Sequence, residues 1–132
     1  MDNTIIDTPL PDGIAGLTDG KTVWLNSKLT PQGRRCTLAH ELAHIKRGII
    51  PNLPAYLYAR EEKKVDEEAA RNLVPLEQLV DAIIWEGCDT KHAALAEVLD
   101  IDRDTLTARL TTASPAEAAI ICRALLDLPQ VP

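Results

Sequence analysis

The segment His40-Glu41-Leu42-Ala43-His44 places two imidazoles and a carboxylate within one short stretch of the chain. Residues four apart lie on the same face of a helix, so His40 and His44 can direct ring nitrogens at one metal ion. Glu41 lies next to that face, where its carboxylate can hold and deprotonate a water molecule at the metal. The segment therefore predicts hydrolysis of peptide bonds with Zn²⁺ as cofactor and Glu41 as general base.

Two histidines leave such a site one ligand short, because a catalytic zinc ion uses three protein ligands and keeps a fourth position for water. A third histidine at the spacing of an extended HExxHxxGxxH motif is absent, since Gly48 lies four residues beyond His44. The remaining donors are the acidic residues of a second predicted helix: Glu61, Glu62, Asp66, Glu67 and Glu68. We favour Glu62, and Asp66 and Glu61 remain alternatives.

Asp66 lies one helical turn after Glu62 on the same face. A carboxylate there can accept the outer ring N–H of a zinc-bound histidine and fix the tautomer of that ring. One helix then supplies both a ligand and the group that orients another ligand. We interpret Cys36, one turn before the motif, as a packing residue and His92 as structural or solvated.

Turn-forming residues divide the rest of the chain into a hairpin and a series of helices. Residues 9–29 predict a hairpin around Asp19-Gly20, and we expect its segment 22–25 to form a sheet edge that holds a substrate strand. Thr30 as N-cap and Gly48 as terminator bound the motif helix. Further helices are expected over residues 59–73, 75–86, 91–99 and 104–112, and after a capping box that starts at Ser114.

These elements predict the α+β class: a mostly helical, zincin-like domain with a small N-terminal sheet and C-terminal helices that resemble a helix-turn-helix. The 132 residues form a single predicted domain, with a zinc-site core over 1–88 and a helical subdomain over 89–132. The segment 89–132 carries seven acidic and four basic side chains, which opposes binding to phosphate. Nucleic acid is therefore not an expected partner, and we interpret the helix-turn-helix-like segment as a packing or protein-recognition element.

The whole chain carries a formal net charge of −6 and has neither a basic, apolar leader nor an apolar stretch long enough to cross a membrane. Its three cysteines form no CxxC pair and lie in apolar helical patterns, which predicts buried, reduced thiols. These features predict a cytoplasmic protein that does not associate with membranes.

Two stretches, Arg34 to His44 and Glu62 to Pro75, resemble the ImmA/IrrE family of metallopeptidases, and the resemblance extends over roughly residues 13–112. An aromatic residue often precedes the alanine pair of the second stretch in that family, and Glu68 stands there in this chain. The second helix is therefore expected to pack differently.

The resemblance implies the roles of individual residues as well as a function. It implies that His40, His44 and Glu62 bind zinc, as in thermolysin-type enzymes, and that Glu41 is the base. Family members are typical of phages, mobile elements and stress loci, and often act on a repressor-like DNA-binding protein. The implied function is a zinc metallo-endopeptidase whose substrate is a helix-turn-helix repressor. The alternative is a non-enzymatic, zinc-containing regulator that binds a repressor protein.

Overall fold

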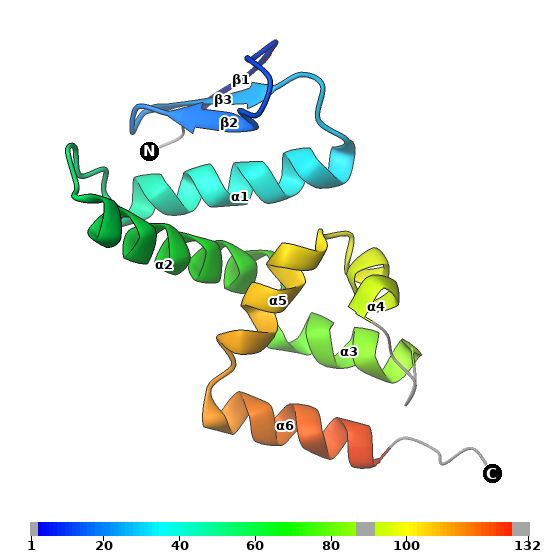
Figure 1. Cartoon of the computed structure of the whole chain (residues 1–132). Helices are drawn as coiled ribbons and strands as arrows, with labels where there is room; N and C mark the ends of the chain where they lie inside the picture. The colour runs from blue at the N-terminus through cyan, green and yellow to red at the C-terminus, as the bar shows by residue number, and fades with distance from the viewer. Residues whose placement is uncertain (1–2, 87–91, 128–132) are drawn as a thin grey trace.

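A computed structural model describes residues 3–86 and 92–127 of the chain. Three strands come first: β1 (Thr4–Thr8), β2 (Gly16–Thr18) and β3 (Thr22–Asn26). The helices that follow are α1 (Pro31–Arg47), α2 (Ala55–Leu73), α3 (Leu76–Glu86), α4 (His92–Leu99), α5 (Arg103–Thr111) and α6 (Pro115–Leu126). The sheet lies over α1, and α6 lies at the opposite end of the molecule (Figure 1). The predicted α+β class is confirmed.

The sheet has the strand order β1-β3-β2, so β3 is its central strand. β2 and β3 form the predicted antiparallel hairpin, in which the Asp19 side chain accepts two backbone N–H groups of the turn. β1 was not predicted, and it pairs in parallel with β3. The prediction that residues 22–25 form a sheet edge was therefore wrong, because β1 and β2 flank that strand on both sides.

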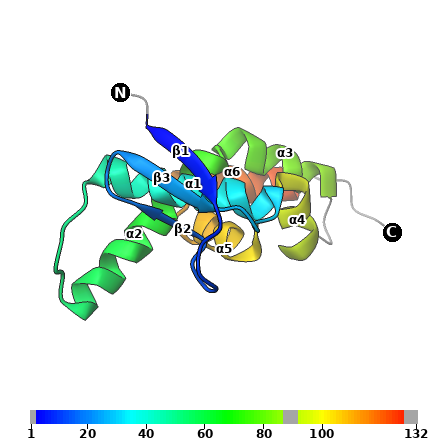
Figure 2. The same cartoon turned by 90° about the horizontal axis from the view of Figure 1, so that it is seen from above.

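One face of β3 packs on the motif helix. Val23 and Leu25 are fully buried, and both β2 and β3 contact α1. α1 begins where predicted, since the Thr30 side chain accepts the N–H of Gly33 at 3.0 Å, and it ends at Gly48, whose φ of 88° suits glycine. The HExxH motif thus lies in the second half of α1, beneath the sheet (Figure 2).

α2 begins at Ala55, four residues before its predicted start, with Pro54 in the N-cap position. The loop before α2, predicted over residues 49–58, therefore ends four residues earlier than predicted. α1 and α2 meet through Ala39, Ala43, Val65 and Ala69, a cluster of small apolar side chains. Their small size lets the two backbones approach closely, so groups at the helix interface can meet.

A second apolar core joins α3, α4 and α5 around Leu79, Leu95 and Leu106. Cys36 of α1 belongs to it and is buried as predicted, whereas Cys122 is exposed on α6, contrary to the prediction. The reason is that α6 packs on α3 by one face and has no fully buried residue. Cys88 and the predicted boundary between residues 88 and 89 lie outside the described residues. None of the described helices is long and apolar enough to cross a bilayer.

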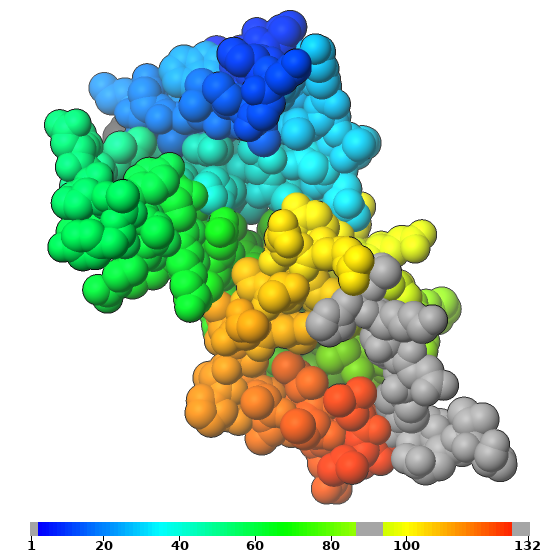
Figure 3. All heavy atoms as spheres, in the orientation of Figure 1, coloured from blue at the N-terminus to red at the C-terminus, as the bar shows by residue number. Residues whose placement is uncertain are grey.

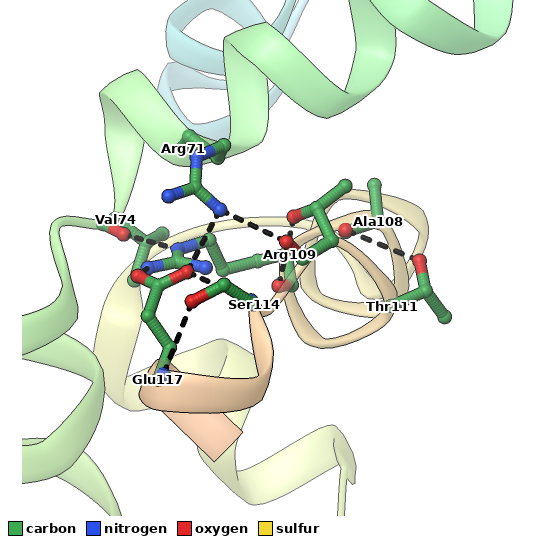
Figure 4. A network of polar contacts seen from close by, with 8 residues as sticks. Arg71, Val74, Ala108, Arg109, Thr111, Ser114 and Glu117 are labelled. Carbon is green, nitrogen blue, oxygen red and sulfur yellow. Dashed lines mark hydrogen bonds and ion pairs between the residues drawn. The ribbon is translucent and has the colours of Figure 1, made fainter. Parts of the chain in front are cut away.

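Polar contacts, the innermost of them buried, connect the C-terminal helices to α2 (Figure 4). Arg109 of α5 is 1% exposed, and it donates from Nε to the Val74 carbonyl at 2.6 Å and from Nη2 to Glu117 Oε2 at 3.0 Å. Arg71 of α2 donates to Glu117 Oε1 at 2.9 Å. Glu117 also closes the predicted capping box with Ser114. These contacts lower the pKa of Glu117 to about 2. The hydrogen bond from the Ser114 N–H contributes most, followed by those from the two guanidinium groups.

This lowered pKa predicts a pH-dependent contribution of Glu117 to stability. A carboxyl whose pKa is lower in the folded state stabilises the fold above its unfolded pKa, and the contribution is lost as pH falls from about 4.5 towards about 2. Glu117→Gln should therefore lower the melting temperature at pH 7, and its difference from the wild type should shrink as pH falls through this range. Glu77→Gln, an exposed change on α3, is the control. An equal difference at pH 7 and pH 3 would contradict the assignment.

Candidate metal centre

His40 and His44 of α1 face Glu62 of α2 across the helix interface. His40 Nε2 lies 3.2 Å from Glu62 Oε2, and His44 Nε2 lies 2.8 Å from Glu62 Oε1. The two imidazole rings meet edge to face, with centroids 4.8 Å apart. One potential ligand atom from each residue lies within 4.8 Å of the others, so the group can hold a metal ion.

Asp66 lies on the other side of the His40 ring. Its Oδ1 is 2.8 Å from His40 Nδ1, and a carboxylate oxygen can only accept, so Nδ1 carries the hydrogen. In the neutral ring, Nε2 then presents a lone pair, and the Glu62 oxygen that faces it presents another. Two lone pairs at 3.2 Å repel unless a positive charge lies between or beside them. The position of Asp66 thus prepares His40 Nε2 to bind a cation.

The donor set fits a zinc ion in both geometry and chemistry. In a tetrahedral site with bonds of about 2.0–2.1 Å, neighbouring ligand atoms are about 3.4 Å apart. One Glu62 oxygen lies 2.8 Å from His44 Nε2 and the other lies 3.2 Å from His40 Nε2, and one donor atom from each of the three residues lies within 4.8 Å of the others. Two imidazoles and one carboxylate also match the ligand types of catalytic zinc, and they leave one position for water.

The sequence left Glu61, Glu62 and Asp66 as candidates for the third ligand. Their contacts in the structure distinguish them. Glu61 turns away from the histidines and forms an ion pair with Arg47. Asp66 contacts only the outer nitrogen of His40, and Glu62 alone faces the inner nitrogens of both histidines. Glu68 forms an ion pair with Lys46, so the residue that departs from the family pattern also packs outside the site.

Glu41 is 8% exposed, and its carboxylate has no hydrogen-bond partner among the described residues. Burial raises the pKa of this carboxyl, as does the negative charge of Glu62, while the two motif histidines oppose the rise. Glu41 and His40 line a pocket of about 490 Å³ between the loop at residues 13–16, α1, α2 and α5. The surface is hollowed where these helices meet (Figure 3). A buried carboxylate that faces a pocket beside three metal-binding groups is suited to take up a proton.

Two residues of this region carried no signal of a site in the sequence analysis. Gly16 of β2 lies directly over α1, because a Cβ there would come within 2.7 Å of Thr37 Cγ2 and 3.4 Å of Glu41 Cγ. Tyr58 lies one turn before Glu62 on α2, and the charge of that carboxylate raises the pKa of the phenol. The four-residue spacing to Glu62 would have indicated Tyr58, whereas Gly16 needed the packing of β2 on α1.

A family model for the IrrE N-terminal-like domain, Peptidase M78, matches residues 5–111. The chain belongs to this family. The matched span begins within β1 and ends with α5, so α6 lies beyond it. Membership makes the chain a metallopeptidase-like domain and confirms the resemblance seen in the sequence. No curated protein and no solved structure matches the chain.

The ligand assignment predicts different effects of neighbouring substitutions on metal affinity. Glu62→Ala should weaken zinc binding by at least about 100-fold, more than the 10–100-fold typical for loss of a group that only orients a ligand. Asp66→Ala should fall within that smaller range. Glu61→Ala, which breaks only the ion pair with Arg47, is the matched control and should bind zinc normally. Competition with a chromophoric chelator measures all three. Equal losses for Glu61→Ala and Glu62→Ala would refute the assignment.

The close approach at Gly16 predicts a stability defect with a specific rescue. Gly16→Ala places a methyl group against Thr37 Cγ2, and overpacking of this kind costs about 1–3 kcal/mol. Thr37→Ser removes that Cγ2 atom, so the double variant should recover part of the loss in free energy of unfolding. Denaturant titration of the two single variants and the double variant gives the coupling energy. Strictly additive effects would show that β2 does not pack on α1 at this point.

Proposed function

We propose that this chain is a zinc-dependent endopeptidase that cleaves a repressor-like regulatory protein of a phage, mobile element or stress locus. Membership of the Peptidase M78 family supports the peptidase part of the proposal. The observation that carries it is the position of Glu41, a buried carboxylate without a hydrogen-bond partner among the described residues, on the wall of a pocket beside His40. A metal site that only held the fold together would not need this group.

Each residue of the site has a separate task in this reaction. His40, His44 and Glu62 would hold the ion, and Asp66 orients the His40 ring. Zinc, when bound, polarises a peptide carbonyl and lowers the pKa of a water molecule to about 7. The Glu41 carboxylate takes the proton from the attacking water and delivers it to the leaving amine. Burial favours the protonated state that Glu41 passes through between these two transfers.

The free edge of β2 is the proposed place for the substrate backbone. β2 pairs with β3 on one side only, and its residue Gly16 lines the pocket with Glu41. An extended segment that adds a strand to this edge would form backbone hydrogen bonds there and bring its own carbonyls past the metal centre. This position replaces the one expected from the sequence, which was on the central strand.

A helix-turn-helix repressor encoded beside the gene for this chain is the substrate we propose to test. Cleavage between its DNA-binding and oligomerisation parts would relieve repression without any contact between this chain and DNA. Such a repressor works in the cytoplasm, and we propose the same location for this chain. Arg109, one of the two arginines of the helix-turn-helix-like segment, is buried against Glu117 and is not presented to a ligand.

Glu41→Gln tests the proposed base, because it removes the proton acceptor and keeps the shape of the side chain. Loss of general acid–base catalysis typically slows a reaction by about 10²–10⁴-fold. We expect Glu41→Gln to retain one zinc ion per chain and to lose cleavage of the co-incubated repressor by that factor. Glu97→Gln, an exposed change on α4, should cleave normally. Metal analysis and mass spectrometry of the products give both readouts.

Two results would contradict the proposal. Cleavage at the wild-type rate by Glu41→Gln would remove Glu41 from its role as base. Capture of an intact repressor by the wild type and by Glu41→Gln alike would indicate a regulator that sequesters its partner without cutting it.

A further inference from the structure

The pocket beside Glu41 has a marked excess of negative charge. Its wall carries four carboxylates, Glu41, Asp66, Asp102 and Asp104, and no lysine or arginine side chain lines it among the described residues. Asp102 and Asp104 come from the start of α5, about 60 residues after the motif in the chain. Their presence at the catalytic pocket shows that the helix-turn-helix-like segment forms one of its walls.

A bound divalent metal ion would not neutralise all the carboxylates in and beside the pocket. Glu62 and Glu41 together balance one divalent cation. Asp66 accepts the His40 N–H at 2.8 Å, and Asp102 Oδ1 accepts the Thr105 backbone N–H at 2.7 Å as the N-cap of α5. Neither aspartate forms an ion pair with a lysine or arginine among the described residues, and the partial positive charge of the α5 N-terminus is equivalent to only about half an elementary charge. Asp104 forms no ion pair with another described residue.

Most of the other residues that line the pocket are apolar, and the pocket has room for a side chain. Ala69, Leu73 and Ala108 contribute aliphatic surface, and the volume of about 490 Å³ lies within the usual range of ligand pockets, about 300–1,000 Å³. The carboxylate of Glu41, more than nine-tenths buried and unpartnered among the described residues, faces the same space. A pocket whose wall combines aliphatic surface with carboxylates suits a side chain with a methylene stem and a cationic end.

We propose that Asp102 and Asp104 make this pocket the subsite for a lysine or arginine side chain of the substrate, next to the bond that is cleaved. The proposal rests on the peptidase function above. The two aspartates are specificity residues that pair with the cationic end of the side chain, whereas Glu41 remains the base. Basic linker segments of a regulatory protein are then preferred over acidic or purely apolar ones.

Binding of a small cationic probe tests the pocket without any need for catalysis. Agmatine carries a guanidinium group at one end of a butyl chain and an ammonium group at the other, and butylurea is a neutral molecule with the same chain. In a titration of the zinc-loaded full chain followed by NMR, agmatine should shift the amides of Asp104 and Thr105, and butylurea should not. Absence of agmatine binding to the wild type would overturn the proposal.

The double variant Asp102→Asn/Asp104→Asn removes both charges, and asparagine at position 102 retains the N-cap. We expect it to bind agmatine at least about tenfold more weakly, the effect of losing one charge-assisted hydrogen bond. Glu77→Gln/Asp81→Asn makes the same change in net charge on the exposed surface of α3 and should bind like the wild type. Equal weakening in both double variants would show a general charge effect and would overturn the proposal.

Cleavage of a proteome-derived peptide library separates this proposal from the peptidase function. The library is made by cutting after glutamate, so lysine and arginine remain inside the peptides. We expect products of the zinc-loaded wild type to be enriched several-fold in lysine or arginine at one position beside the new ends, and the Asp102→Asn/Asp104→Asn variant to lose this enrichment. Cleavage without enrichment would overturn the subsite and leave the peptidase function standing. No cleavage by a zinc-loaded chain that still binds agmatine through Asp102 and Asp104 would reject the peptidase function and retain the acidic pocket as a binding site for cations.

Discussion

The contact of the Glu62 carboxylate with the Nε2 atoms of both histidines depends on how closely α1 and α2 approach. Glutamate has a short reach, so 2.8 and 3.2 Å contacts require the two helix backbones to lie near each other. Ala39, Ala43 and Ala69 permit this approach, and Val65 fills the space between them. A larger residue at one of these alanines would move the two helices apart and separate the donors. The alanine-rich interface is therefore as much a part of the metal centre as the ligands.

The same constraint acts on the other side of α1, where the sheet lies. Because Gly16 has no side chain, the backbone of β2 packs closely against Thr37 and the aliphatic part of Glu41. This packing helps to bury Glu41 and brings a free strand edge beside it. Burial raises the pKa of the Glu41 carboxyl, so the approach of β2 affects the chemistry of the base as well as the stability of the fold. The sheet, the proposed base Glu41 and the candidate metal ligands are thus coupled through α1.

The elements that sequence reasoning predicted well have local signals. Thr30 and Gly48 bound α1, the Asp19 turn makes the hairpin, and the spacing of Glu62 and Asp66 follows from one turn of a helix. β1 was missed because its five residues include two isoleucines that are each 40% exposed, and because it pairs in parallel with β3 across a long connection. Once β1 is present, β3 cannot be an edge. Non-local pairing of this kind leaves little trace in a single sequence.

The pocket was beyond sequence reasoning for a related reason, since its walls come from four separate segments. A pattern can indicate that residues 91–110 form two short helices, but it cannot show that the start of α5 lines the same pocket as Glu41. The third ligand could be predicted in part. Spacing limited it to a few acidic residues, and the ion pair of Glu61 with Arg47 in the structure distinguishes Glu61 from Glu62. The family match includes the motif helix α1 and the acidic helix α2 in this order along the chain. It ends before α6 and gives no information about the contacts of that helix.

α6 nevertheless contributes to the site through the buried contacts at its start. Glu117 accepts from Arg71 of α2 and from Arg109 of α5, and Arg109 also donates to the Val74 carbonyl at the end of α2. α2 and α5 are the two helices that carry Asp66 and the aspartate pair at 102 and 104 into the pocket. A guanidinium that is 1% exposed holds its position only while its carboxylate partner stays in place, because a buried charge without a counter-charge is unfavourable. The helix that lies outside the family match is therefore connected, through Glu117, to both of the helices that form walls of the pocket beside the proposed base Glu41.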